Sequence, residues 1–284
     1  MSTSKKITLI IINYNSSKNT NNLLLSVKKY IYEKIDEIII VDNNSKDIKD
    51  LDIKDSKIKL IKNDKNFGFA KAVNQGIDKS KNSFIILLNP DTTIVDTSIL
   101  QTIDLIIKDK KIGVIGGKIE YKSKKIFSAN NIPTFLTGLF EFTNLKKIFP
   151  NNKFSLNFWP EKNNKIIKPI EVSGICGAYL IFRKYNKNNN INYFNEDYFL
   201  YLEDLDFCLD MKSKGFKIIF DPRSKILHIG GASSNNKYNM SLNYWYKSRK
   251  IFFKKHLNDV EGIILNIIFT LEELLLKTRS FIKP

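Results

Sequence analysis

Short apolar runs alternate with segments of helical periodicity through the first 120 residues, and this alternation constrains the fold more than any other feature. The expected strands are Ile7–Ile12, Glu37–Val41, Ile58–Ile61, Phe84–Leu88 and Ile112–Ile115. The expected helices contain Leu23, Leu24, Val27 and Ile31, and cover Phe69–Ile77 and Ile99–Ile107. Uninterrupted apolar runs are typical of strands buried on both faces. Strands alternating with helices predict an α/β fold with a mostly parallel, doubly wound sheet.

The second half of the chain is less regular. Glu120–Lys168 holds three prolines and nine aromatic residues, which predicts loops and short elements packed over the sheet. Order returns with a strand-like Ala178–Phe182, a helix at Phe207–Lys214 and a strand at Phe216–Phe220. The tail from Tyr244 onward is expected to be helical.

Polar clusters follow three of the predicted strands, at Asn13–Asn15, Asp42–Ser45 and Asn89–Asp91. The carboxyl ends of parallel strands share one edge of a sheet, and ligands bind there. A carboxylate such as Asp42 beside Tyr14 can accept the imide N–H of a nucleobase. The alternative is that these residues only cap turns and helices.

Two further segments suit a diphosphate and its metal ion. Gly68 precedes a helix whose N-terminus, with Lys71, could meet a pyrophosphate, although a plain helix start explains it equally well. Asp91 follows a central strand, where a carboxylate can ligate Mg²⁺ or Mn²⁺ bridging two phosphates. An ordinary strand-ending turn is the alternative.

Three carboxylates, Glu203, Asp204 and Asp206, lie within the aromatic and apolar stretch 198–208. Charge in such a place is costly unless it is paired, metal-bound or used in chemistry. His228, one of two histidines, lies in an apolar segment that ends in Gly230-Gly231. A structural role is the usual one for a single histidine, and a ligand role stays open.

The order and spacing of these motifs resemble the family 2 glycosyltransferases, which have a GT-A fold. The Asn-Pro-Asp and Glu-Asp-x-Asp variants resemble the bacterial rhamnosyltransferase-like branch. The similarity covers about residues 7–256. The matching motifs are Asn13-Tyr14-Asn15, Val41-Asp42-Asn43-Asn44-Ser45, Asn66-x-Gly68, Asn74-x-Gly76, Asn89-Pro90-Asp91, Gly177-Ala178 and Glu203-Asp204-Leu205-Asp206.

This resemblance implies a role for each matched residue. The nucleotide-sugar would be bound by Asn13, Tyr14, Asn15, Asp42, Asn66, Lys71, Asn74 and Asn89. Asp42 would hold the base, and Lys71 and Asn74 would lie near the diphosphate and ribose. Asn89 replaces the first acid of the Asp-x-Asp metal motif, which leaves Asp91 as the main carboxylate ligand.

The catalytic half follows in the same way. Asp204 matches the catalytic base, and Glu203 and Asp206 would position it or the acceptor. His228 lies 24 residues after Asp204, where related enzymes carry a metal-ligating histidine. The expected organisation is a nucleotide-sugar-binding half (1–120), an acceptor-binding and catalytic half (121–258) and a C-terminal helix (259–284).

The implied activity is inverting transfer from a nucleoside-diphosphate sugar, such as dTDP-rhamnose or a UDP-sugar, with Mg²⁺ or Mn²⁺ as cofactor. The acceptor would be a glycan or a lipid-linked glycan in cell-surface polysaccharide synthesis, such as O-antigen. A catalytically inactive scaffold is one alternative. The net charge of +17 suggests a nucleic-acid-binding protein as another, but only four of the 46 basic residues are Arg and no nucleic-acid-binding motif is present. We therefore expect no nucleic-acid partner.

The expected subcellular location is inferred from the N-terminal and C-terminal segments and from the cysteines. Two cysteines, Cys176 and Cys208, predict buried free thiols, and no signal peptide or membrane-spanning run is seen. The expected location is cytoplasmic. Aromatic and cationic residues at 244–256, followed by the apolar Ile263–Leu276, suggest peripheral attachment to the inner face of an anionic membrane. The alternative is a helix packed on the sheet or in an oligomer interface.

Overall fold

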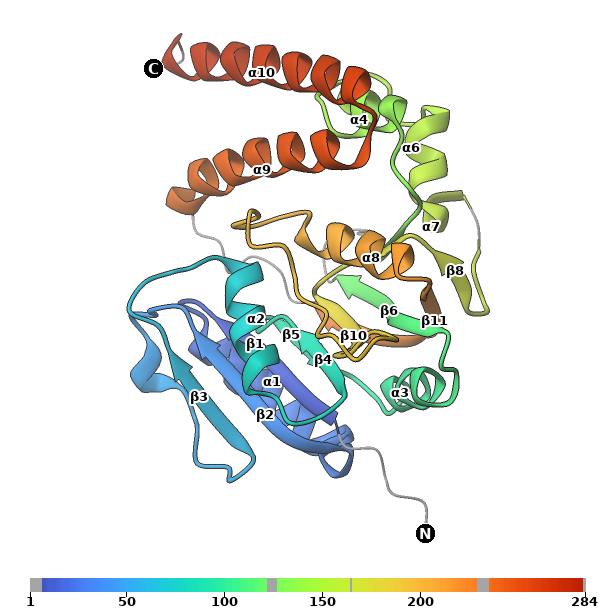
Figure 1. Ribbon diagram of the computed structural model, residues 1–284. Coiled ribbons are helices and arrows are strands. Elements are labelled where there is room, and N and C mark those ends of the chain that lie inside the picture. Colours follow the sequence, from blue (N-terminus) through green and yellow to red (C-terminus); the bar gives the residue numbers. More distant parts are fainter. Residues whose placement is uncertain (1–6, 122–126, 164, 229–234, 283–284) are drawn as a thin grey trace.

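The computed structural model describes residues 7–121, 127–163, 165–228 and 235–282 (Figure 1). The main sheet contains β1 (Ile7–Asn13), β2 (Ile35–Asp42), β3 (Ile58–Lys62), β4 (Phe84–Leu88), β5 (Thr92–Ile94), β6 (Ile112–Tyr121), β8 (Ile170–Val172), β10 (Tyr179–Arg183) and β11 (Lys217–His228). The helices that flank it are α1 (Ser17–Tyr30), α2 (Phe69–Lys79), α3 (Ile99–Lys108) and α8 (Glu203–Ser213).

The strand order is β3-β2-β1-β4-β10-β6-β11-β5, with β8 on β11. Strands β1, β2, β3 and β4 are parallel, and β11 is parallel to β6. Strand β10 lies antiparallel between β4 and β6, so β6 and β11 point the same way as β4. The predicted α/β, mostly parallel GT-A fold is confirmed.

Both faces of the sheet are covered by helices, which explains the uninterrupted apolar strands. Ile7, Leu9 and Ile11 of β1 pack with α1 and α3 in one core. Ile10 and Ile12 point the other way, into a second core with α2 and α8. Alternate side chains of one strand are therefore buried on opposite faces.

The structure differs from the sequence prediction at several element ends. Strand β5 was not predicted, because three residues carry too little periodicity. Helix α8 begins at Glu203 rather than Phe207, since the acidic residues occupy its first turn, where negative charge is favourable. Strand β11 continues to His228, past an irregularity between Asp221 and Lys225 that accommodates Pro222.

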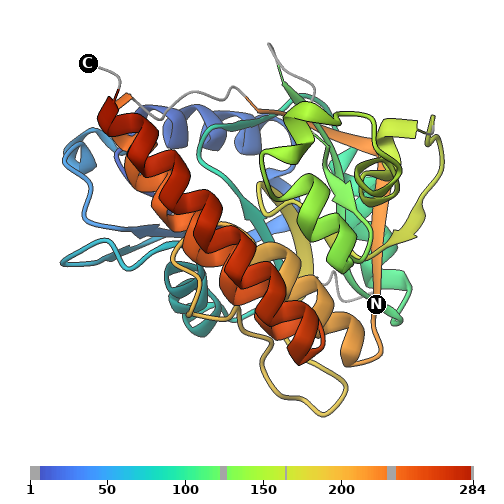
Figure 2. The same cartoon turned by 90° about the horizontal axis from the view of Figure 1, so that it is seen from above.

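A helical layer lies above the sheet (Figure 1). It contains α4 (Phe135–Glu141), α5 (Leu145–Ile148), α6 (Lys153–Phe158), α7 (Pro160–Asn163), α9 (Asn235–His256) and α10 (Asp259–Ile282), and the small strands β7 (Ala129–Asn130) and β9 (Gly174–Ile175) pair beneath it. The region 120–168 thus forms short elements, as predicted. Helices α9 and α10 run side by side and α10 is outermost (Figures 1 and 2). In the described ranges, no helix is long and apolar enough to cross a bilayer.

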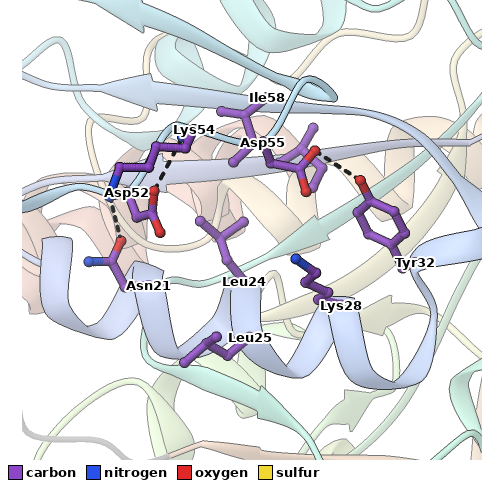
Figure 3. Close-up of a pocket in the computed structure, with 10 residues that line it drawn as sticks. Asn21, Leu24, Leu25, Lys28, Tyr32, Asp52, Lys54, Asp55 and Ile58 are labelled. Carbon is purple, nitrogen blue, oxygen red and sulfur yellow. Dashed lines mark hydrogen bonds between the residues drawn. The ribbon is translucent and has the colours of Figure 1, made fainter.

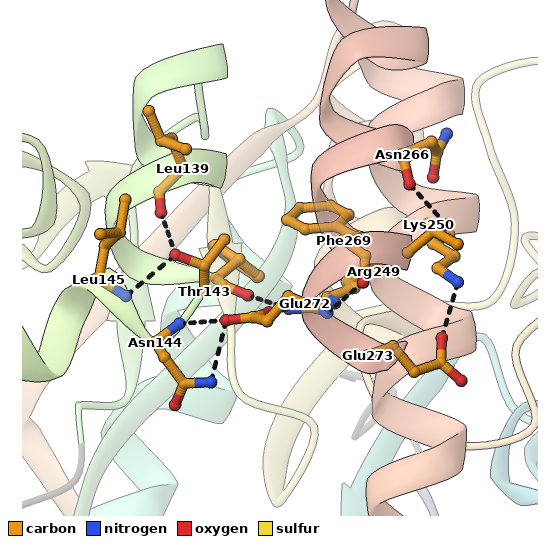
Figure 4. A network of polar contacts seen from close by, with 12 residues as sticks. Leu139, Thr143, Asn144, Leu145, Arg249, Lys250, Asn266, Phe269, Glu272 and Glu273 are labelled. Atoms are coloured by element: carbon orange, nitrogen blue, oxygen red, sulfur yellow. Dashed lines mark hydrogen bonds and ion pairs between the residues drawn. The ribbon is translucent and has the colours of Figure 1, made fainter. Parts of the chain in front are cut away.

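The aromatic segment 244–256 turns much of its apolar surface inward, although Lys247, Lys254 and Lys255 are exposed, which differs from the membrane interpretation. Tyr246, Phe252 and Phe253 are buried, and Phe252 and Phe253 belong to a core shared with α10 and α4. Arg249 is buried with them, because it donates to the Phe142 carbonyl and pairs with Glu272 at 2.6 Å (Figure 4). The aromatic and cationic pattern therefore stabilises the helical layer.

Arg249→Met is expected to lower the free energy of unfolding by about 3–5 kcal/mol, because it leaves Glu272 partly buried without its cation. Lys250→Met on the same helix is the matched control. Lys250 pairs with Glu273 but is more exposed, so its loss should cost about 1 kcal/mol or less. Urea denaturation measures both values. Equal losses in the two variants would contradict the assigned role of Arg249.

Candidate active site

The polar clusters meet at one edge of the sheet, as the parallel topology predicts. Strands β1, β2, β4, β6 and β11 all end at this edge. Their ends carry Asn13, Asp42, the Asn89–Asp91 turn, Tyr121 and His228. Strand β10 runs the other way and starts here, so Gly177 just before it lies at the same edge.

Asp91 and His228 form a pair across this edge. His228 Nε2 lies 3.3 Å from Asp91 Oδ1, and both side chains are largely buried. Burial lowers the pKa of His228, against the opposing effect of the Asp91 carboxylate. The Tyr121 ring packs on the imidazole at 4.6 Å between centroids, which fixes the orientation of the ring.

This pair suits a divalent cation that is completed by phosphate oxygens. Two ligands of one octahedral ion, each about 2.1 Å from it, lie about 3 Å apart, close to the separation observed. Within the described residues, no three His, Cys, Asp or Glu side chains converge as a complete metal centre. Among the described residues, Asp91 and His228 are therefore the pair that could hold such an ion, and the Ile229–Gly231 segment lies outside the described residues.

Asp204 lies in the first turn of α8 and faces the loop before β10. Its Oδ2 accepts the Gly177 N–H at 2.7 Å, and its Oδ1 accepts the Leu205 N–H at 2.8 Å. A Cβ on Gly177 would lie 3.2 Å from Asp204 Cβ, so the glycine permits this close approach. Burial raises the pKa of Asp204 above its ordinary value, although both N–H groups oppose the shift.

The neighbours of Asp204 differ sharply from one another. Glu203 is buried, and its Oε2 has no hydrogen-bond partner among the described residues. Burial and the nearby Asp204 charge raise the pKa of Glu203 well above its ordinary value. Burial also opposes the charged form of Asp206, but hydrogen bonds from His256 and Lys255 hold its pKa below the ordinary value. Asp206 therefore joins α8 to the end of α9.

The chain enters α8 through a strained turn. Tyr201 has φ of 75° and Leu202 has φ of 67°, a left-handed conformation that is unfavourable for side chains other than glycine. Two such residues in a row are typical of segments that the surrounding structure holds in place at functional sites. Here they set the direction from which Glu203 and Asp204 enter the site.

The residues after β1 and β2 form a buried network. Asn13 Nδ2 donates to Asp42 Oδ1 at 2.7 Å and to Ser45 Oγ, and Asp42 Oδ2 accepts the Ser45 N–H. Asn15, at a positive φ of 50°, accepts the Lys46 N–H. Both oxygens of Asp42 are thus engaged by the protein. The base-binding role of Asp42 stays a prediction: each oxygen can accept a further hydrogen bond, but the buried side chain would have to become accessible to a base.

Side chains of α2 that were predicted to contact the ligand also contact the 194–199 loop of the protein. Asn74 bonds the backbone of Phe194 and the Glu196 carboxylate, and Lys71 Nζ lies 3.7 Å from Glu196. The Phe69 N–H at the helix start donates to the Phe199 carbonyl. These residues of α2 therefore also hold the 194–199 loop against the helix.

A cavity of about 290 Å³ opens beside these elements. It brings together four predicted residues: Tyr14, Asn66, Asn89 and Asp91. Asn43, from the predicted Asp42–Ser45 cluster, also lines it, whereas sequence analysis assigned no site role to Phe69, Phe199, Tyr201, Ser241 and Tyr244. The last two belong to α9, and Phe199 and Tyr244 stack at 4.2 Å. The aromatic content of 198–201 was the only signal for this wall.

A second cavity, of about 340 Å³, lies between α1 and the β2–β3 edge (Figure 3). Its lining includes Tyr32, whose hydroxyl donates to Asp55, and the apolar side chains of Leu24, Leu25 and Ile58. None of the predicted site residues lines it. The strand-end cavity is therefore the candidate active site.

Comparison with known proteins agrees with this assignment. The family described as Glycosyl transferase family 2 matches residues 8–189, more than half of the chain. The chain belongs to glycosyl transferase family 2. The match includes β1, β2 and the Asn89–Asp91 turn, whereas Asp204 and His228 lie beyond it.

Curated relatives of this family 2 member share low identity with it. The N-acetylglucosaminyl-diphospho-decaprenol L-rhamnosyltransferase of Mycobacterium tuberculosis is 23% identical over 69% of this chain and 66% of its own length. The poly-beta-1,6-N-acetyl-D-glucosamine synthase of Staphylococcus aureus is 23% identical over 76% of this chain and 48% of its own length. The chain thus spans about one half to two thirds of these relatives.

Solved structures share the fold. S. aureus TarS has a TM-score of 0.53 at 16% identity, over 93% of this chain and 70% of that chain. GalNAc-T7, solved with UDP, GalNAc and Mn²⁺, has a TM-score of 0.58 at 15% identity, over 89% of this chain and 50% of that chain. At these identities the likeness shows the fold alone.

Proposed function

We propose that this family 2 glycosyltransferase is an inverting enzyme that uses a nucleoside-diphosphate sugar and a glycan or lipid-linked acceptor. The observation that supports it best is the shared edge of the sheet. Asp204, held by the Gly177 N–H, lies at the same edge as the Asp91 and His228 pair. A base and a diphosphate site are both needed for displacement at an anomeric carbon.

Asp204 would take the proton from the acceptor hydroxyl as its oxygen attacks the anomeric carbon. The bond from that carbon to the diphosphate oxygen breaks on the opposite face, so the anomeric configuration inverts. The raised pKa of Asp204 suits a base, because a more basic carboxylate accepts a proton more readily. Glu203 and Asp206 would hold the first turn of α8 in position.

Asp91 and His228 would hold a divalent Mg²⁺ or Mn²⁺, with Asn89 beside them. When bound, such an ion neutralises the charge that develops on the leaving diphosphate. Tyr14, Asn66 and Asn89 of the cavity wall would contact the nucleotide-sugar, and Lys71 and Asn74 would lie near its diphosphate and ribose. Asn13, Asn15 and Asp42 would support the base.

The donor is proposed to be dTDP-rhamnose or a UDP-sugar, in the synthesis of a cell-surface polysaccharide such as O-antigen. Support comes from the mycobacterial relative, named as an L-rhamnosyltransferase on a decaprenol-linked acceptor, and from a TarS structure titled as a complex with UDP-GlcNAc. With such an acceptor, the enzyme would act in the cytoplasm at the inner face of the membrane.

Incubation with UDP-, dTDP- and GDP-sugars in the presence of Mn²⁺ tests the proposal. Release of nucleoside diphosphate from a UDP- or dTDP-sugar is expected, and proton NMR should show that the first-formed product has the inverted anomer. A product with retained configuration would contradict the inverting mechanism. If neither the wild type nor Asp204→Asn turns over any of these donors, the result would favour a catalytically inactive scaffold.

The pH dependence of kcat/KM should show an acidic limb set by Asp204. The base works when deprotonated, so activity rises as pH rises through its pKa, and burial places that pKa above the ordinary value of about 3.9. The measurement is kcat/KM as a function of pH, for the wild type and for the residual activity of Asp204→Asn. An identical acidic limb in both would assign the limb to another group.

A further inference from the structure

Helix α10 exposes a continuous apolar face, although its other side packs on α9 and α4. From residue 260 to residue 275, every exposed residue except Thr270 is apolar. Seven side chains, 42–67% exposed, form what we term the α10 stripe: Val260, Ile263, Ile264, Ile267, Leu271, Leu274 and Leu275. They recur every three or four residues, so they lie on one face of the helix.

Of the three acidic residues between 260 and 275, Glu261 is half-buried in the first turn of α10, and the other two are paired away from the stripe. Glu272 pairs with the buried Arg249 and accepts hydrogen bonds from Asn144, and Glu273 pairs with Lys250 (Figure 4). Both carboxylates are thus used within the helical layer. The stripe itself carries no charge between residues 260 and 275.

Basic and apolar side chains are exposed together next to α10. The Asn144–Glu272 hydrogen bonds place the start of α5 against α10. Just beyond, Lys146 and Lys147 are exposed, as are Ile148 (67%) and Phe149 (51%). Apolar groups bordered by lysine and an aromatic ring match the chemistry of the boundary between lipid headgroups and acyl chains.

The stripe also lies on the outer side of a helix pair that borders the active site. Ser241 and Tyr244 of α9 line the strand-end cavity, and α10 lies beyond α9, away from the sheet (Figures 1 and 2). A surface bound by α10 is therefore separated from the cavity wall by one helix layer. This geometry brings the cavity close to whatever α10 binds.

We propose that the α10 stripe, together with Lys146, Lys147 and Phe149, binds the surface of an anionic lipid bilayer, with α10 lying in the plane of the membrane. The net charge of +17 attracts the chain to anionic lipid and opposes association with a second, equally charged copy. The inference adds to the proposed function the surface that would meet a lipid-linked acceptor, but binding itself requires no catalysis.

Flotation of the full chain with vesicles of phosphatidylethanolamine and phosphatidylglycerol tests the proposal. The triple variant Ile267→Gln, Leu271→Gln, Leu274→Gln removes apolar surface without adding charge and keeps good helix formers. The affinity of this variant for the vesicles should fall by about tenfold or more. The matched control, Leu25→Gln with Ile53→Gln, alters two exposed apolar residues elsewhere and should float as the wild type does.

A second variant tests the charge. Lys146→Gln with Lys147→Gln should weaken binding to these vesicles and leave weak binding to neutral phosphatidylcholine vesicles unchanged. The proposal is overturned if the wild type does not float, or if the triple variant floats equally well. It is also overturned if sedimentation shows a dimer that only the triple variant loses, since a second copy would then cover the stripe. Donor hydrolysis measured without vesicles reports separately on the proposed function.

Discussion

Asp204→Asn should lower kcat by about 10²–10⁴-fold, the range typical of losing a general base, while the affinity for UDP or dTDP stays near the wild-type value. The amide is almost the same size and can still accept the Gly177 N–H, but it cannot take a proton from the acceptor. Steady-state transfer at saturating donor measures the loss, and calorimetry measures nucleotide binding.

The matched control is Asp210→Asn on the same helix. Asp210 pairs with Lys214 at the surface and is not part of the site, so this variant should keep nearly full activity. Asp204→Asn retaining more than about a tenth of wild-type turnover would contradict its assignment as the base.

Asp91→Ala should lower turnover by about 10²-fold or more, because it removes the carboxylate that would hold the divalent cation needed to neutralise charge on the leaving diphosphate. His228→Ala should cost less, since imidazole contributes no negative charge. Chelation should abolish transfer by the wild type, and added Mn²⁺ or Mg²⁺ should restore it. Titration of Mn²⁺ binding in the presence of UDP gives a readout that is separate from turnover.

Asp96→Ala is the control for this site, because Asp96 follows Asp91 closely in the chain but is a half-exposed carboxylate that pairs with Lys225. It should bind Mn²⁺ and UDP as the wild type does. Full wild-type activity in excess chelator would remove both Asp91 and His228 from the metal role.

The sequence predicted the sheet well and the side-chain directions less well. Continuous apolar runs located β1, β2 and β4 because a strand covered on both faces has no polar side to obscure its pattern. The same topology brought Asp91 and His228, which are 137 positions apart, to one edge. Sequence spacing could not show that Asp42 and Asn74 turn into buried hydrogen-bond networks.

The tail shows the same limit more plainly. Alternating aromatic and cationic residues at 244–256 fit a membrane surface and a packed helix equally well by composition. Packing against α4 and α10 buries Phe252, Phe253 and Arg249, and the exposed apolar surface falls on α10 instead. Which residues of 244–256 are buried depends on which face of α9 contacts other helices. That contact involves parts of the chain more than 100 residues earlier, such as the segment around Phe142.

The antiparallel insertion of β10 has a consequence for synthesis on the ribosome. Strand β4 is complete at Leu88, but its partner ends at Arg183, so the apolar β4 edge has no partner until roughly 90 more residues have been made. At about 5–20 residues per second this lasts on the order of 5–20 s. During that interval the nascent chain presents an uncovered strand edge that can pair with other chains. The strand that brings Gly177 to Asp204 thus also makes early folding of this protein dependent on protection of β4.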